Sequence, residues 1–158
     1  MGKITAPAPI GPGHILVGFD CDAPVLNDWL LRLALKNEET GASRTFVVCS
    51  ERQVIGYYAL AAGSVHRQEA PGKIRRGMPE PVPVMVLGRL AVDRRWQGQD
   101  IGRGLLKDAV ARTLLAATHA GMRALLVHAL SDAARSFYLH HGFQQSPLNP
   151  FTLMLPLA

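Results

Sequence analysis

The chain has 158 residues, of which 48% are hydrophobic and 18% are charged. This length and composition favour one compact domain over residues 1–158 and exclude a disordered chain, and no apolar run approaches the roughly 18 residues of a membrane span. The formal net charge of +5 at pH 7 favours contact with polyanions, although it also serves solubility alone.

The first elements combine a proline-rich start with a short strand and a helix. Prolines at positions 7, 9 and 12 predict an extended or mobile lead-in over residues 1–13, rather than a signal peptide. Ile15 to Phe19 fits a strand, and a helix is expected from Pro24 to Lys36, with Asp22 as its cap. The two cysteines lack metal-site spacing, so we expect reduced thiols in a cytoplasmic protein.

The middle of the chain alternates strands with a polar loop. Residues Arg44 to Ser50 and Val54 to Ala61 predict a β-hairpin. A polar segment with prolines and an excess of arginine and lysine follows from Ser64 to Pro81, and it predicts a loop with a short helical turn. The apolar run from Val82 to Val92 predicts a central strand.

Strands and helices alternate through the second half. An apolar stripe predicts a helix from Gly102 to Ala120, followed by a strand from Ala124 to Ala129. Ser131 and Asp132 cap a helix that runs to about His140, and Phe151 to Leu155 forms the last strand. The fold class is therefore α/β with a mixed sheet.

The stretch from Leu90 to Leu106 joins strand, loop and helix. A glycine-rich loop that opens a helix directs several backbone N–H groups and the positive end of the helix dipole at one spot, so it is a candidate site for pyrophosphate. Its glycine spacing is that of neither the Walker loop nor the dinucleotide fingerprint.

This stretch resembles the acetyl-CoA-binding segment of the GNAT superfamily of N-acetyltransferases, in which Gln or Arg is followed by two residues, Gly, one residue, and Gly or Ala. Gln97 and Gly102 match the first and last positions, whereas Asp100 stands where the pattern has glycine. A second frame begins at Gln99 and uses Gly102 and Gly104, but the frame at Gln97 is preferred. The resemblance implies that acetyl-CoA contacts Leu90, Ala91, Val92, Gln97, Gly98, Gln99, Asp100, Ile101, Gly102 and Arg103.

A second match lies in Phe137-Tyr138 and Gly142-Phe143, which resemble the end of the last GNAT helix. That helix lies beside the cofactor sulfur in the family. The resemblance implies that Tyr138 protonates the departing CoA thiolate, and that the fold is a mixed, mainly antiparallel sheet flanked by helices. An ordinary core tyrosine is the alternative.

Nearly the whole chain resembles the acetyltransferase toxins of bacterial toxin-antitoxin pairs. The matching segments include Arg44 to Val48, Arg75 to Pro79, Arg89 to Asp93 and Phe137 to Phe143. This resemblance implies transfer of acetyl from acetyl-CoA to the α-amino group of aminoacyl-tRNA, a block of translation, a homodimer, and neutralisation by a ribbon-helix-helix antitoxin.

The acceptor-stem surface is predicted from basic residues, because Arg and Lys supply most phosphate contacts. The candidates are Arg67, Lys73, Arg75, Arg76 and Arg89. A solvated loop is the alternative. His140 and His141 are adjacent and so face different sides of a helix, and no metal site is expected.

Two other functions stay open at this point. One is a GNAT enzyme that acetylates a small amine or a protein amine, which would leave the basic loop without a role. The other is a non-catalytic module that binds nucleic acid or an antitoxin, since the carboxylate of Asp100 opposes pyrophosphate binding.

Overall fold

A computed structural model describes residues 3–157. Its strands are β1 (Ala8–Pro9), β2 (Arg44–Ser50), β3 (Gln53–Val65), β4 (Val82–Val92), β5 (Ala124–His128), β6 (Gln144–Gln145) and β7 (Thr152–Pro156). Its α-helices are α1 (Pro24–Arg32), α2 (Ala34–Thr40), α3 (Gly72–Arg75), α4 (Ile101–Ala116) and α5 (Asp132–His140).

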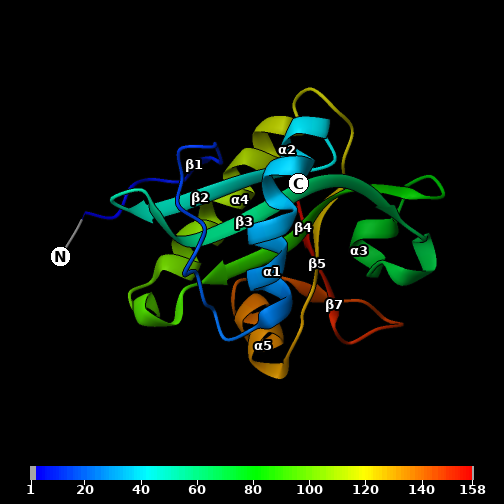
Figure 1. The fold of residues 1–158 in the computed structure, drawn as a ribbon. Coiled ribbons are helices and arrows are strands. Elements are labelled where there is room, and N and C mark those ends of the chain that lie inside the picture. Colours follow the sequence, from blue (N-terminus) through cyan, green and yellow to red (C-terminus); the bar gives the residue numbers. More distant parts are fainter. Residues whose placement is uncertain (1–2, 158) are drawn as a thin grey trace. The chain divides into compact units, whose positions relative to one another are not determined.

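The strands form one sheet in the order β1-β2-β3-β4-β5-β7-β6, flanked by helices (Figure 1). The β4–β5 pair is parallel, whereas β1–β2, β2–β3, β5–β7 and β6–β7 are antiparallel. The predicted fold class is confirmed. The chain groups into two compact units, residues 1–61 with 89–109 and residues 62–88 with 110–158.

In the first unit, the described part of the lead-in extends along β2. Thr5 N donates to the Cys49 carbonyl at 2.9 Å, and Ile10 N donates to the Thr45 carbonyl at 2.9 Å. Ile10 is buried. Within the extended or mobile lead-in predicted over residues 1–13, residues 3–13 are thus held by backbone hydrogen bonds and by the buried side chain of Ile10. The proline-rich composition did not indicate these contacts.

The predicted strand from Ile15 to Phe19 is wrong, because only Ile15 forms a bridge, with Gln53, before the chain turns through Gly18. The predicted helix from Pro24 to Lys36 is two helices that meet at Leu33. The cap prediction also fails, since Asp22 has a φ of 67° and the residue that caps α1 is Ala23.

An aromatic cluster fills the core of the first unit. The Trp29 ring stacks on the Tyr57 ring with centroids 5.9 Å apart, and Phe19 meets Tyr57 edge-on at 5.6 Å. The Tyr57 hydroxyl donates to the Leu26 carbonyl at 2.7 Å, so its polar end is satisfied inside the core.

Helix α4 approaches the sheet closely at Gly56. A Cβ atom there would lie 2.9 Å from Val48 Cγ2 and 3.1 Å from Leu105 Cδ1. Only glycine therefore allows the first turns of α4 to pack against β3 at this distance. The helix begins one residue before the predicted Gly102 and ends at Ala116 rather than Ala120.

The second unit contains the parallel pair, in which Val84 lies opposite Ala124 and Leu87 opposite Val127. Ile74 of α3 packs on this sheet with the buried side chains Leu126 and Met154. The Ser131 hydroxyl accepts from Ala134 N at 3.1 Å, so the predicted cap of α5 is confirmed. The described residues include no helix that could cross a membrane.

Candidate active site

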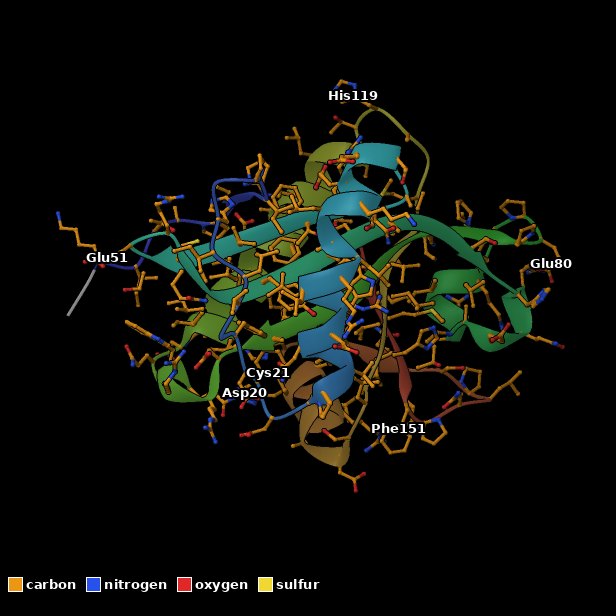
Figure 2. The ribbon with its side chains drawn as sticks, viewed as in Figure 1. Asp20, Cys21, Glu51, Glu80, His119 and Phe151 are labelled. Carbon is orange, nitrogen blue, oxygen red and sulfur yellow. The ribbon has the colours of Figure 1, made fainter. Side chains whose placement is uncertain are left out.

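The loop between β4 and α4 begins at Asp93, whose side chain is completely buried. Its carboxylate accepts hydrogen bonds from Arg95 N at 2.9 Å, Arg95 Nε at 3.0 Å and Asp20 N at 3.1 Å. Asp20 lies on the segment that leads into α1 (Figure 2). Burial alone would raise the pKa of Asp93, but the hydrogen bonds from Arg95 and Asp20 outweigh it and lower the pKa. The Asp93 carboxylate is therefore ionised and hydrogen-bonded, and it fixes the start of the loop.

Asp93 was not predicted as a site residue. Its backbone N–H donates to the Ile55 carbonyl at 2.8 Å, so the residue also joins the loop to β3. The available signal was an aspartate directly after a strand, which often bonds the backbone N–H two residues later. These contacts make Asp93 a residue that positions the loop.

Gln97 ties the middle of the loop to the end of β4. Its Nε2 donates to the Val92 carbonyl at 3.0 Å. The side chain therefore holds the loop in place.

The start of α4 offers amides that have no partner within the helix. The first hydrogen bond of the helix runs from Gly104 N to the Asp100 carbonyl at 3.0 Å. The N–H groups of Ile101, Gly102 and Arg103 precede it and have no partner within the helix, as is usual for a first turn. Such a group of amides fits a phosphate anion.

The backbone explains why the family pattern has glycine at position 100. Asp100 has a φ of 63°, and Gly98 has a φ of 82°. Both values lie in the left-handed region, which glycine adopts freely and aspartate tolerates better than most residues. Asp100 is exposed, so its backbone fits the loop while its charge stays beside the helix start.

The nearby arginines have other partners. Arg94 forms ion pairs with Asp20 at 3.5 Å and Asp22 at 4.0 Å, and Arg95 pairs with Asp93 at 3.0 Å. Of the three arginines that could offset the charge of Asp100, only the exposed Arg103 has no ion pair within residues 3–157. The carboxylate of Asp100 is therefore not neutralised by Arg94 or Arg95.

A groove of about 400 Å³ adjoins the loop within the first unit. Arg95, Trp96 and Gln99 line it from the loop, and Gln53 and Ile55 line it from β3. The predicted contact residue Gln99 thus borders open space.

Tyr138 lies in the second unit, near the C-terminus of α5, and is 5% exposed. Its ring contacts Phe137 and Phe143, each with centroids 5.2 Å apart. Burial raises the pKa of the Tyr138 phenol above its ordinary value. The hydroxyl therefore keeps its proton over the physiological range and can act as a donor.

Four of the predicted basic residues share one exposed segment of the second unit, namely Arg67, Lys73, Arg75 and Arg76. Two features hold the segment in place. The side chain of Ile74 is buried, and the Arg123 guanidinium donates to the carbonyls of Ile74 and Lys73 at 3.1 and 3.2 Å. Arg89 belongs to the first unit, where its guanidinium lies 4.5 Å from the centre of the Trp29 ring. The structure thus groups four of the five residues.

Metal binding finds no support in the described part of the chain, where no group of three or more His, Cys, Asp or Glu side chains could hold an ion. His140 and His141 stack edge to face at 5.2 Å, and the His141 ring contacts the Phe137 carbonyl at 2.8 Å. These histidines pack at the end of α5.

The chain is similar to known acetyltransferases. A family model described as an acetyltransferase (GNAT) domain matches residues 41–145. The tRNA-acetylating toxin of Mycobacterium tuberculosis (strain ATCC 25618 / H37Rv) is 49% identical over 155 residues, which cover 98% of this chain and 93% of that protein.

Two solved structures are also similar. AtaT complexed with acetyl-methionyl-tRNAfMet has a TM-score of 0.89 and 30% identity, covering 98% of this chain and 95% of that one. A mutant AtaT toxin bound to the C-terminus of the antitoxin AtaR and acetyl-CoA has a TM-score of 0.82 and 29% identity, covering 98% and 94%.

Proposed function

The chain belongs to the GNAT family of acetyltransferases, and from this premise we propose that it is a toxin that transfers acetyl from acetyl-CoA to the α-amino group of aminoacyl-tRNA. The observation that carries the proposal is the loop from Asp93 to Arg103, whose anchors and free helix amides suit a pyrophosphate. The 49% identity to a tRNA-acetylating toxin supports the choice of acceptor.

The loop residues fit acetyl-CoA, with one opposing charge. Gly98, Gln99, Ile101, Gly102 and Arg103 offer amides or charge to the pyrophosphate, and a Cβ added at Gly98 would meet nothing within 4 Å. Leu90, Ala91 and Val92 provide the strand end along which the donor lies. Asp100 weakens binding, because a carboxylate and a phosphate compete for the same positive end of the helix.

Acetyl-CoA supplies an acetyl group activated as a thioester, so the protein needs to align the amine and stabilise charge. The backbone N–H groups near Leu90 and Val92 meet the negative charge that develops on the carbonyl oxygen. Tyr138 donates its phenolic proton, directly or through water, to the departing sulfur. Its apolar surroundings keep the phenol protonated until the sulfur departs.

The tRNA is held through its phosphates by Arg67, Lys73, Arg75 and Arg76, with Arg89 as a further contact. The exposed side chains of the first four have no ion pair within residues 3–157 and are therefore available to phosphates. Arg89 is the least available, because it already lies over Trp29.

The remaining parts of the proposal concern assembly and location. The protein forms a homodimer, and a ribbon-helix-helix antitoxin neutralises it. Supporting this, the similar AtaT toxin is known bound to the C-terminus of the antitoxin AtaR. Charged tRNA is the substrate, so the protein acts in the cytoplasm.

Release of free CoA in the presence of different acceptors tests the function. Charged tRNA should accelerate release strongly, whereas deacylated tRNA, a peptide with a free N-terminus and a panel of small amines should not. Acceleration by a peptide or a small amine alone would replace the proposed acceptor. Bound acetyl-CoA with no acceleration by any of them would favour a non-catalytic module.

A further inference from the structure

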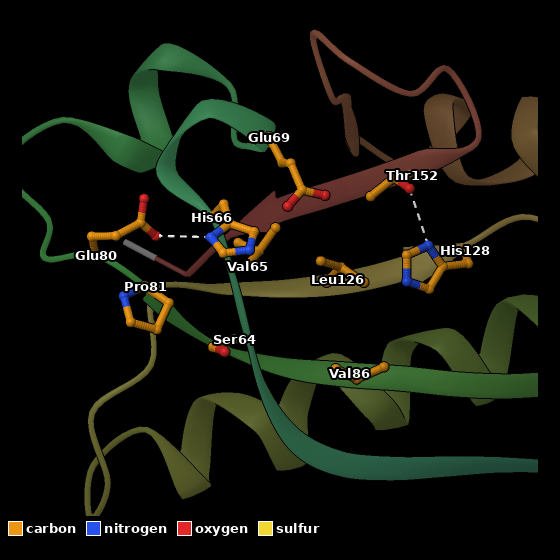
Figure 3. Close-up of a pocket in the computed structure, with 10 residues that line it drawn as sticks. All are labelled: Ser64, Val65, His66, Glu69, Glu80, Pro81, Val86, Leu126, His128 and Thr152. Atoms are coloured by element: carbon orange, nitrogen blue, oxygen red, sulfur yellow. Dashed lines mark hydrogen bonds and ion pairs between the residues drawn. The ribbon is translucent and has the colours of Figure 1, made fainter.

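The second unit contains a cavity of about 280 Å³ that holds none of the predicted site residues (Figure 3). Val86 of β4 and Leu126 of β5 give it an apolar wall, and Ser64 to His66 border it at the end of β3. Its volume suits a group of amino-acid size rather than a whole nucleotide chain.

The cavity carries acidic side chains, although the chain as a whole has a net charge of +5. Glu80 lies 3.4 Å from His66 Nδ1 and accepts from Arg67 N at 3.3 Å, so it is held in place. Glu69 is half-buried and forms no ion pair with any described residue, and its carboxylate points into the space between His66 and Thr152 (Figure 3). This arrangement favours a cation and disfavours a phosphate.

His128 supplies a second functional group at the cavity. It is the last residue of β5 and the first beyond the pairing with β4, which ends at Leu87 and Val127. Its Nδ1 lies 3.0 Å from Oγ1 of Thr152, which is buried. The other ring nitrogen lies on the side of Leu126, away from Thr152 (Figure 3).

Thr152 can therefore define the chemistry of His128. When the Thr152 hydroxyl accepts from Nδ1–H, the Nε2 atom has a free lone pair and can accept a proton. In that tautomer the second ring nitrogen is a proton acceptor held in one orientation, in a cavity that favours a cation.

Resting on the proposed function, we infer that this cavity receives the α-ammonium group of the aminoacyl-tRNA and that His128 Nε2 takes its proton. The amine of an aminoacyl ester is a cation attached to a polyanion. The acidic cavity and the basic segment belong to the same unit, and Arg67 of the basic segment directly follows His66 of the cavity. This arrangement matches the positive amine and the negative phosphates of the substrate.

His128 and Tyr138 act on different protons. His128 removes one from the ammonium, whereas Tyr138 donates one to the departing sulfur. The ammonium first loses one proton to His128, which passes it to solvent. The neutral amine then forms the new N–C bond while the C–S bond breaks. A second proton then passes from the nitrogen to solvent water, while the departing sulfur gains one from Tyr138, which is reprotonated from solvent. Because an acidic cavity stabilises the ammonium form of the amine, a proton acceptor is needed beside it to produce the neutral amine.

Two variants and one control test the inference. Binding is measured without acetyl-CoA, for charged and deacylated tRNA. Glu69→Gln should weaken binding of charged tRNA and leave binding of deacylated tRNA unchanged, whereas Glu51→Gln, at an exposed turn, should change neither. Equal binding of charged tRNA by Glu69→Gln and the wild type would contradict the cation site.

Single-turnover transfer tests His128. His128→Asn should lower the rate with charged tRNA by about 10²-fold while acetyl-CoA binding is retained. Free imidazole should restore part of the rate to His128→Ala, which a purely structural role would not allow. An unchanged rate in His128→Asn, or no rescue of His128→Ala, overturns the assignment. If the wild type transfers nothing to charged tRNA, the proposed function itself fails.

Discussion

Gln97 donates its side-chain hydrogen bond to the carbonyl of Val92 at 3.0 Å, so the first residue of the loop motif is bound to the last residue of the strand before it. The residue thereby fixes the shape of the loop. Together with the buried carboxylate of Asp93, this bond fixes both the start and the middle of the loop.

Replacing Gln97 by Met should weaken acetyl-CoA binding about 2- to 10-fold, because the variant keeps the side-chain size but loses one hydrogen bond. Calorimetric titration of CoA measures this. Gln99→Met, in the same loop, serves as the matched control and should have the smaller effect. Equal losses in the two variants would show that the bond to Val92 has no special role.

Replacing Asp100 by Asn should tighten acetyl-CoA binding by about 1.5- to 5-fold, since the charge is removed from a helix N-terminus while the left-handed backbone is still tolerated. The gain should shrink as salt is added. Asp100→Gly should bind at least as tightly as Asp100→Asn. Unchanged or weaker binding in both variants would rule out the charge effect.

Asp93 should govern stability in a pH-dependent way. Its pKa in the folded protein is lowered, so its contribution is complete above the unfolded pKa of about 3.9 and is lost as pH falls through the folded pKa. Asp93→Asn should cost about 1.5–3 kcal/mol at pH 7. Thermal unfolding from pH 7 to pH 3 measures the difference between wild type and variant, which should narrow only below about pH 4. A constant difference would contradict the prediction.

Replacing both Arg75 and Arg76 by Ala should weaken tRNA binding and reduce its salt dependence. Loss of two phosphate contacts lowers the slope of log K against log salt by about 1.4 to 1.8. Binding of charged tRNA at several salt concentrations measures the slope. Arg32→Ala, an exposed arginine of α1 that pairs with Asp28, is the control. An unchanged slope in the double variant would remove the basic segment from the tRNA surface.

The parts predicted well have strong local signals. The bounds of β4 agree with the sequence prediction, because most residues from Val82 to Val92 are apolar despite the interruptions at Pro83 and Gly88. The failures arise where packing overrides the local pattern. Ile15 to Phe19 has the composition of a strand, but Phe19 instead fills the aromatic core beside Tyr57. The two-residue strands β1 and β6 are too short to leave a pattern.

The candidate site likewise combines residues that the sequence motif predicted with residues that it could not predict. The sequence motif predicted the loop and Tyr138, whose roles remain predictions. It could not predict Asp93 as the anchor, because the partners of its carboxylate include the backbone of Asp20, 73 positions earlier in the chain. Nor could it predict the cavity with His128 and Thr152, since strand pairing alone brings these residues together.

The most direct test of the central claim is transfer of labelled acetyl from acetyl-CoA to a pool of charged tRNA, by the wild type and by Tyr138→Phe. We expect label on the α-amino group of the amino acid, and a rate about 10²-fold or more lower in the variant, with CoA binding retained in both. No label on the amino acid in the wild type, despite CoA binding, would contradict it. A wild-type rate in Tyr138→Phe would contradict the role of the phenol.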